Sequence, residues 1–296
     1  MGFRLTLRES LPDGLKRVFR EQIESALKLC RNPSEQRGVT VHEVRKRLKK
    51  LRAAMRLAIG EVGKSQHARE DRSVRKIGRP VSDLRDAQVR LQTLIQLRDE
   101  TAKRPGDSPF ARIEELLSLE RESFSAAFAG WQKQAIPQLK RVEARLLKWP
   151  LEDLTWKQIC GTVGKIYKRG QRCLAKTIDN PEPEKFHAWR KRVKDLSYQL
   201  RILQPLNRVV LEEMAHDAEV LGELLGREHD LDFLWARLEK EGGDETLRDE
   251  LAKFEKLVRK RGKRLRTNAL ELGRHFYAEP AKAFAKRISI FVRKRT

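Results

Sequence analysis

Cysteine and long apolar stretches are scarce in this sequence. Its three cysteines, Cys30, Cys160 and Cys173, are far apart and form no C-x-x-C motif. No disulfide framework is therefore expected, which suits a reducing compartment. The longest uncharged stretch near the middle, Ser123–Gln132, is well short of the roughly 20 residues that span a membrane. The opening residues lack the apolar segment of a secretory signal. These absences predict a soluble, cytoplasmic protein.

Signals for β-strands are also lacking, because no segment shows a convincing two-residue alternation of apolar and polar residues. Apolar residues instead recur every three or four positions nearly everywhere, and Leu, Ala, Lys, Arg and Glu dominate, as is typical of helices. Clusters of Gly, Pro and Asn interrupt this pattern, for example at Gly60–Lys64, Arg104–Ser108 and Trp149–Asp153. The pattern predicts an all-α fold with about eight long helices and a short terminal one.

Positive charge is present in large excess. The chain has 296 residues, with 65 Lys and Arg against 42 Asp and Glu, and a net charge of +23. Solubility alone does not require so much charge, so a polyanionic partner is expected. Nucleic acid, an anionic membrane surface and inorganic polyphosphate are all open at this point, as is a protein that is simply basic.

One basic segment occurs twice. The stretch VHEVRKRLKK at 41–50 matches FHAWRKRVKD at 186–195, and His187 lies 145 residues after His42. Further along, Asp230 lies 144 residues after Asp86, so the register is kept. The interruption at Trp149–Asp153 separates the two copies. The repeat predicts two homologous halves, 1–150 and 151–296, each a bundle of about four helices, which together make one domain.

On a helical wheel, each copy has an apolar face and, beside it, a row of mostly cationic side chains, which we call a ladder. The first ladder spans about 21 Å at the rise of an α-helix. Its like charges repel one another, so helix stability does not explain the row, whereas a bound polyanion would. The alternative is the solvated face of a surface helix. The first ladder consists of His42, Arg45, Lys46, Lys49, Arg52 and Arg56, and the second of His187, Arg190, Lys191, Lys194, Tyr198 and Arg201.

A histidine opens each ladder. It is expected either to donate a hydrogen bond to an anionic oxygen, with some charge near neutral pH, or to be a core or helix-capping residue whose hydrogen bonds are made within the protein. Neither a metal nor a cofactor is expected, because the ladders have no H-x-x-x-H or carboxylate pairing at ligand spacing. Asp86 and Asp230 are candidates to hold a ladder side chain in place, although Arg85 and Asp86 alone would make an ordinary surface ion pair. Other basic residues that could join the same surface are Lys16, Arg17, Arg20, Arg79, Arg85, Lys165, Lys168, Arg169, Arg172, Arg227 and His229.

The paired H-x-x-R-[RK]-x-[LV]-K segments, each followed by a segment ending in Asp86 or Asp230, resemble the conserved-histidine α-helical domain (CHAD) family. The resemblance covers nearly the whole chain, from Leu15 to about Phe291. It implies two pseudo-symmetric four-helix bundles around a basic central groove or pore, binding of inorganic polyphosphate, and no enzymatic activity. It also implies an association with polyphosphate granules or polyphosphate-metabolising proteins. The residues at matching positions are His42, Arg45, Lys46, Lys49, Arg52, His187, Arg190, Lys191 and Lys194.

The low aromatic content fits polyphosphate. That polymer offers only charge, oxygen geometry and length, which rows of Arg and Lys can recognise. Aromatic residues make up only 6% of the chain, whereas binders of single-stranded nucleic acid usually stack bases on aromatic rings. The alternatives are a helical protein that binds RNA or DNA through backbone charge, and a structural adaptor. Ladders that face one another would favour a thin chain, and ladders that face outward would favour a duplex.

The segment Ala58–Ser65 resembles a relaxed phosphate-binding loop. A true phosphate-binding loop follows a strand and opens a helix, whereas this segment follows a predicted helix. Its glycines are therefore expected to end the first ladder helix, and no nucleotide-hydrolysing activity is predicted.

Overall fold

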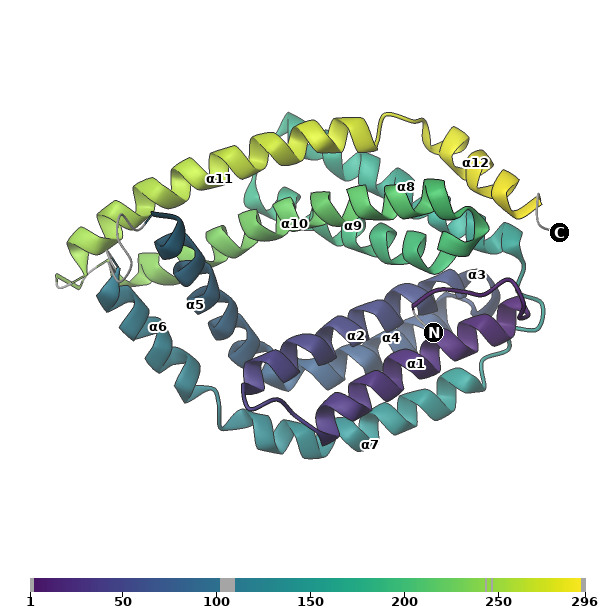
Figure 1. Cartoon of the computed structure of the whole chain (residues 1–296), viewed down its shortest axis with the longest axis horizontal. Helices are drawn as coiled ribbons and strands as arrows, with labels where there is room; N and C mark the ends of the chain where they lie inside the picture. Colours follow the sequence, from purple (N-terminus) through teal and green to yellow (C-terminus); the bar gives the residue numbers. More distant parts are fainter. Residues whose placement is uncertain (1–2, 102–109, 243, 246, 294–296) are drawn as a thin grey trace.

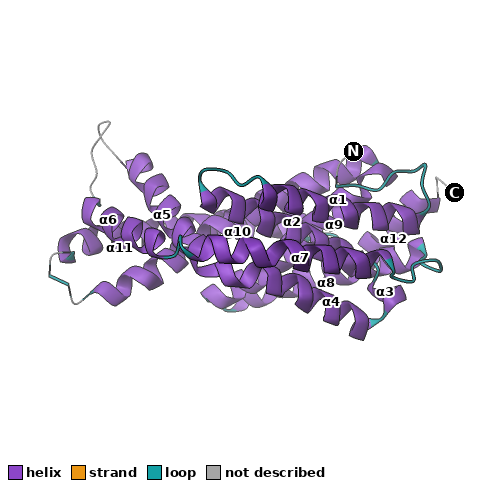
Figure 2. Ribbon diagram, turned by 90° about the horizontal axis from the view of Figure 1, so that it is seen from below, coloured by secondary structure: helices purple, strands orange, loops and turns teal. Residues whose placement is uncertain are grey.

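All regular secondary structure in the computed structural model is helical over the residues it describes, which are 3–101, 110–242, 244–245 and 247–293 (Figures 1 and 2). This confirms the predicted all-α class. The predicted interruption at Arg104–Ser108 lies outside the described residues. The α-helices are α1 (Leu11–Arg31), α2 (Arg37–Leu57), α3 (Ile59–Val62), α4 (Lys64–Gly78), α5 (Ser82–Thr101), α6 (Ala111–Ser123), α7 (Ala127–Leu147), α8 (Trp156–Asp179), α9 (Pro183–Leu203), α10 (Arg208–Leu238), α11 (Arg248–Phe276) and α12 (Ala281–Arg293).

Four helices form a bundle in the first half of the chain. Helix α1 packs against α2 and α7, and α4 packs against the same two helices, so the four enclose one core (Figure 1). The hydroxyl of Ser10 begins α1 by accepting a hydrogen bond from the backbone N–H of Asp13, at 3.2 Å. Between α2 and α4 the chain makes the short helix α3 and then turns at Gly63, whose φ of 79° favours glycine. The segment Ala58–Ser65 thus joins helices, and no strand precedes it among the described residues.

Helices α8, α9, α10 and α11 form the bundle of the second half. Each packs against its neighbour in that order, α11 returns to α8, and α12 covers the outer side of α8 (Figure 1). A capping box of Thr155 and Gln158 begins α8, and the side chain of Asn207 caps α10. With lengths of 31 and 29 residues, α10 and α11 extend well beyond their bundle partners.

The prediction of four helices in the first half undercounts what the structure contains. The pattern from 65 to 103, expected as one helix, is divided into α4 and α5 by a 3₁₀ turn at Arg79–Val81. Pro80 explains this division, because proline has no N–H to donate and its ring clashes with the preceding turn. A second turn at 124–126 separates α6 from α7. Helices α5 and α6 thereby leave the first bundle and pack against the far ends of α10 and α11 (Figure 1).

The hydrophobic core is shared between the two halves of the chain. The larger cluster of buried side chains runs from Leu5 to Val292 and includes residues of both bundles. The smaller cluster joins α5 and α6 to α10 and α11, for instance through an edge-to-face contact of Phe110 and Phe254 at 5.1 Å. The halves therefore fold onto one another, and the boundary at residue 150 stays a prediction, as does their symmetry. In the described part of the chain, no helix combines the length and apolar character needed to cross a bilayer.

Candidate anion-binding site

The two ladders lie on neighbouring helices from opposite halves of the chain. Helices α2 and α9 are in contact, and Arg56 Nη1 on α2 lies 2.7 Å from Asp195 Oδ1 on α9. Charge also acts across this boundary. Burial lowers the pKa of Lys49 to about 8, and the positive charges of Arg190 and Lys194 on the other helix contribute to the shift. The ladders therefore face one another at Lys49, which is the arrangement that favours a thin polymer.

Glycines let the ladder side chains pass close to the neighbouring helices. The side chain of Lys194 passes close to α10 at Gly222. A Cβ added to Gly222 would lie 2.9 Å from Lys194 Cε. Arg190 crosses the same helix at Gly226, at an ordinary contact distance of 3.5 Å. In the first half, Arg45 Nη1 donates hydrogen bonds to the carbonyl oxygen of Gly78 at 2.9 Å and to Ser82 Oγ at 3.0 Å. These contacts hold three of the ladder cations in defined directions.

Helices α5 and α10 complete the site with residues near the second repeated segment of each half. Arg85 comes from α5, and its pKa is lowered by burial despite the opposing charge of Asp230 on α10. The rings of His187 and His229 are in contact, with centroids 4.2 Å apart and planes tilted by 35°. We call this group of basic residues the cation cluster: His42, Arg45, Lys49, Arg85, His187, Arg190, Lys191, Lys194 and His229.

Most cations of the cluster lack an ion-pair partner in the described structure, whereas His42 Nε2 lies 3.9 Å from Glu43 Oε1. Within the residues that the structure describes, Arg45, Lys49, Arg85, Arg190 and Lys194 form no ion pair with a carboxylate. Two buried nitrogen atoms, Nδ1 of His187 and Nε of Arg190, have no hydrogen-bond partner. Buried polar atoms in folded proteins nearly always have such a partner. An anion bound among these side chains would supply both the missing charge and the missing acceptors.

Asp86 and Asp230 are carboxyl groups that interact electrostatically with the cluster. Burial raises the pKa of both, and the charges of Arg45 and Arg190, respectively, oppose that shift. Neither approaches a cluster cation within ion-pair distance. They therefore moderate the positive potential without filling the site. Among the described residues, no three His, Cys, Asp or Glu side chains are grouped as metal ligands would be.

Solvent reaches His42 and Lys49 although protein surrounds both side chains. The side chain of His42 is 47% exposed and Lys49 is also exposed, yet burial is the main cause of the lowered pKa of each. A side chain that is open on one side and surrounded by protein on the others has both properties. The pKa values of His42 and His229 are lowered to about 4, so both rings are neutral at pH 7 in the free protein. Burial also lowers the pKa of His187, the other histidine that opens a ladder, so the predicted gain of charge near neutral pH would require an anion beside these rings.

The C-terminal ends of both ladders differ from the cluster because their side chains have partners. Arg52 Nε lies 2.6 Å from Asp71 Oδ1, Arg56 is paired with Asp195, and Arg201 is paired with Glu219. Tyr198 packs edge to face against Phe3, with ring centroids 6.1 Å apart. Lys46 is also partly neutralised, by Glu43 on the same helix at 3.4 Å. These carboxylates compensate the ladder ends, so the free positive charge is concentrated near the first two turns of each ladder.

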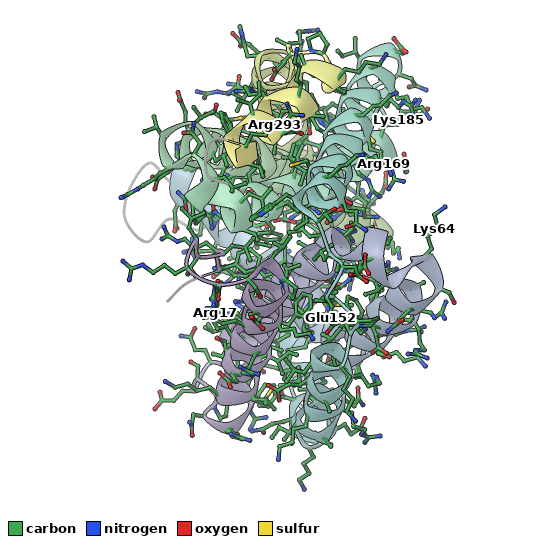
Figure 3. All side chains as sticks on the ribbon, turned by 90° about the vertical axis from the view of Figure 1, so that its right-hand side faces the viewer. Arg17, Lys64, Glu152, Arg169, Lys185 and Arg293 are labelled. Carbon is green, nitrogen blue, oxygen red and sulfur yellow. The ribbon has the colours of Figure 1, made fainter. Side chains whose placement is uncertain are left out.

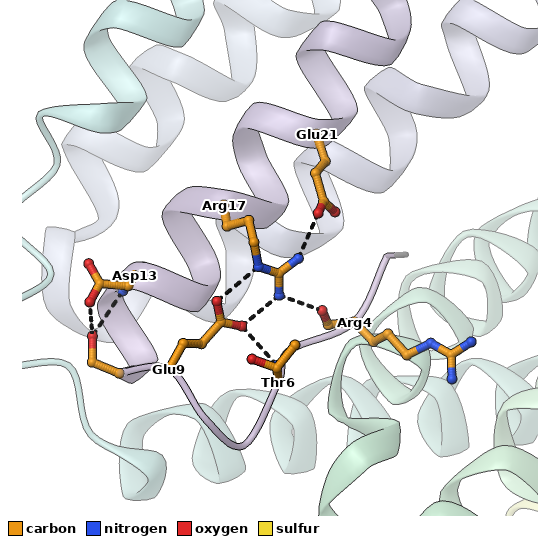
Figure 4. Close-up of polar contacts among 7 residues, drawn as sticks. Arg4, Thr6, Glu9, Asp13, Arg17 and Glu21 are labelled. Carbon is orange, nitrogen blue, oxygen red and sulfur yellow. Dashed lines mark hydrogen bonds and ion pairs between the residues drawn. The ribbon is translucent and has the colours of Figure 1, made fainter. Parts of the chain in front are cut away.

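The structure places Arg17 and its neighbours outside the cluster. Arg17 donates hydrogen bonds to Glu9, to Glu21 and to the carbonyl oxygen of Arg4, and thereby fastens the N-terminal segment to α1 (Figure 4). Arg20 is exposed near Glu143 of α7, and Lys16 is paired with Glu152 at 3.4 Å. Arg17 and Lys16 thus have carboxylate partners that are not part of the cluster.

The basic residues of α8 also lie apart from the ladders. Figure 3 shows Arg169 on α8, in the opposite half of the molecule from Arg17. The four predicted residues of this helix are exposed, and none forms a hydrogen bond or ion pair with a ladder residue in the described structure: Lys165, Lys168, Arg169 and Arg172. Arg79 is different, because it lines a pocket together with Arg45 and Lys49.

Sequence reasoning missed the contribution of α4. Arg72, Arg75 and Lys76 line the same pocket as Arg79 and were not among the predicted residues. The signal was present, because these three residues recur at three- and four-residue spacing and so share one side of a helix. What the sequence did not reveal is that this side faces the first ladder.

Comparison with known proteins identifies the family and the fold. Residues 21–239 match the CHAD domain family, so the chain belongs to that family, which is linked to polyphosphate binding. The solved structure of the CHAD domain from the plant Ricinus communis is similar, with a TM-score of 0.65 and 17% sequence identity over 95% of this chain and 94% of that one. At this identity the likeness shows the shared fold alone. No curated protein matches the chain.

Proposed function

We propose that this protein binds inorganic polyphosphate in the cation cluster and does not act on it chemically. The observation that carries the proposal is a set of five Arg and Lys side chains, contributed by α2, α5 and α9, which interact electrostatically with one another and form no ion pair in the described structure. Membership of the CHAD family supports the same ligand. Phosphate oxygens accept hydrogen bonds from several such donors at once, and Arg presents two of them in parallel.

The arrangement favours a bare phosphate chain over nucleic acid. The cluster as defined contains no Phe, Tyr or Trp side chain, and two of its three histidine rings, His187 and His229, pack against each other at a tilt of 35°. The charges of Arg190 and Lys194 act on Lys49 from the other ladder, and a thin polymer between the ladders could contact both rows. A duplex would instead need cations spread over an outward surface.

Recruitment to polyphosphate granules would follow from such binding. Because the cluster recognises repeated phosphate groups, it would hold the protein on the polymer and bring bound partner proteins near it. Polyphosphate-metabolising proteins are the partners that this role suggests. Purified protein should leave the polymer chain length unchanged, and shortening or extension of the polymer would overturn the proposal that binding is the whole activity.

Charge reversal in both ladders tests the site. We expect a variant with Arg45, Lys49, Arg190 and Lys194 changed to Glu to lose polyphosphate binding while circular dichroism shows retained helix. The matched control reverses four exposed lysines of α11 and should keep binding: Lys253, Lys256, Lys260 and Lys263. Equal losses in both variants would mean that net charge, and not the cluster, determines binding.

A competition experiment tests the ligand. Long-chain polyphosphate is titrated against duplex DNA and structured RNA at two salt concentrations, because charge-driven affinity has meaning only at a stated salt. The proposal expects polyphosphate to displace both nucleic acids at near-physiological salt. Equal competition by all three polymers would instead identify a site that responds to charge alone.

A further inference from the structure

A second basic surface lies beside the cation cluster, between α2 and α4. It is a pocket of about 430 Å³, and we call it the α2–α4 pocket. Its apolar floor includes Leu48 and Val74, and the remaining lining is mostly cationic. The cationic lining residues are Arg45, Lys49, Arg52, Arg72, Arg75, Lys76 and Arg79.

Positive charge in this pocket greatly exceeds negative charge. In the described structure no carboxylate lines it, and Asp71 is the one acidic group paired with its cations. Asp71 lies 2.6 Å from both Arg52 and Arg75, so it compensates part of the charge on those two side chains. Among the described residues, Arg72, Lys76 and Arg79 have no ion-pair partner, and all three are exposed. A concentrated set of like charges without counterions lowers stability unless an anion occupies it.

The pocket is continuous with the cation cluster. Arg45 and Lys49 line the pocket and also belong to the cluster. Within the cluster, Lys49 interacts electrostatically with Arg190 on α9, and Arg45 interacts with Arg85 on α5. Arg45 is fixed at the junction by its hydrogen bonds to Gly78 and Ser82. A flexible anionic chain held in the cluster therefore meets a second row of cations as soon as it passes α2.

We propose that the α2–α4 pocket is a second phosphate-binding subsite for the same polymer, which continues from the cation cluster past Arg45 and Lys49 onto α4. This inference rests on the proposed function. It assigns phosphate-binding roles to Arg72, Lys76 and Arg79, and it makes the affinity depend on polymer length. A short oligophosphate occupies the cluster alone, whereas a long chain gains contacts in both places. No aromatic side chain lines the pocket in the described structure, which favours a phosphate chain over single-stranded nucleic acid.

The test measures how the affinity for long and short phosphate chains depends on the charge of the pocket. The pocket variant carries Arg72→Gln, Lys76→Gln and Arg79→Gln, which leaves the pairs of Asp71 with Arg52 and Arg75 intact. For long-chain polyphosphate, the slope of log affinity against log salt should become shallower by about 2, since each phosphate contact on a single strand contributes about 0.7. For tripolyphosphate, affinity and slope should stay at the wild-type values. A control variant with Lys253, Lys256 and Lys260 changed to Gln on α11 removes the same charge elsewhere.

The outcomes separate this inference from the proposed function. If the wild-type protein binds no long-chain polyphosphate, the proposed function fails. If it binds, but the pocket variant keeps the wild-type slope or loses no more than the α11 control, the pocket inference alone is wrong. Loss of tripolyphosphate binding to the same extent would also overturn it, because the pocket would then be part of the primary site. Loss of duplex DNA binding without loss of polyphosphate binding would assign the pocket to nucleic acid.

Discussion

Proton uptake at Lys49 should make polyphosphate binding pH-dependent in the range from 7 to 9. In the free protein the pKa of Lys49 is about 8, because burial and the neighbouring charges of Arg190, Arg45 and Arg85 oppose its protonation. A polyanion in the cluster neutralises those charges and favours the protonated amine. Binding therefore raises the pKa of Lys49 toward the usual range for lysine, near 10.4.

The sign and size of the effect follow from this shift. At pH 7 the amine is already mostly protonated, so the polymer meets a charged Lys49 without proton uptake. At pH 9 it is mostly neutral in the free protein, and binding must take up a proton from solution. Affinity therefore falls as pH rises through 8, by about tenfold between pH 7 and pH 9 for this one group. Lys194, whose pKa is also lowered, adds to the fall in the same direction.

A Lys49→Arg variant isolates the contribution of Lys49. Arginine stays charged throughout this range, so the variant should lose about tenfold less affinity than the wild type between the two pH values. Fluorescence anisotropy with labelled long-chain polyphosphate at constant ionic strength measures both profiles. A long chain is used because its internal phosphates do not titrate there. Identical profiles for the two proteins would refute the reasoning and place Lys49 outside the binding surface.

Three further predictions concern the free protein and its ligand-bound state. Arg190→Gln should raise the melting temperature of the free protein by about 1–2 °C, because it removes unpaired like charge. Arg56→Gln should lower the melting temperature, because Asp195 loses its closest partner. Scanning fluorimetry that shows the reverse order would contradict the division between paired and unpaired cations. Gly222→Ala should weaken polyphosphate binding several-fold in titration calorimetry, because the added Cβ displaces Lys194. Gly226→Ala is the control and should bind polyphosphate normally. Equal affinities for the two variants would contradict a role for the contact between Gly222 and Lys194. Polyphosphate at about 100 times its Kd should raise the wild-type melting temperature by about 5 °C or more, and an unchanged value would argue against binding to the folded state.

The repeated segments show how far sequence alone reaches toward the site. The matching register of His42 with His187 and of Asp86 with Asp230 identified the helices that carry the site, and the folded chain gathers these four residues around one cluster. Helical periodicity also separated the cationic row from the apolar face, because both depend on a local rotation of about 100° per residue. The basic residues of α1 and α8 were less predictable, because the face that a helix turns toward its neighbours depends on packing.

Local sequence therefore determined the helical class, the approximate boundaries of most helices, the excess of positive charge, and the two ladders in which part of that charge lies. Tertiary structure decided which of those charges remain free. Asp71, Asp195 and Glu219 come from other helices and compensate Arg52, Arg56 and Arg201, while Arg45, Lys49, Arg190 and Lys194 receive no such partner in the described structure. It also brought the basic side of α4 next to the first ladder. The physical reason is that an ion pair requires two side chains within a few ångströms, and that distance depends on how helices far apart in the sequence pack.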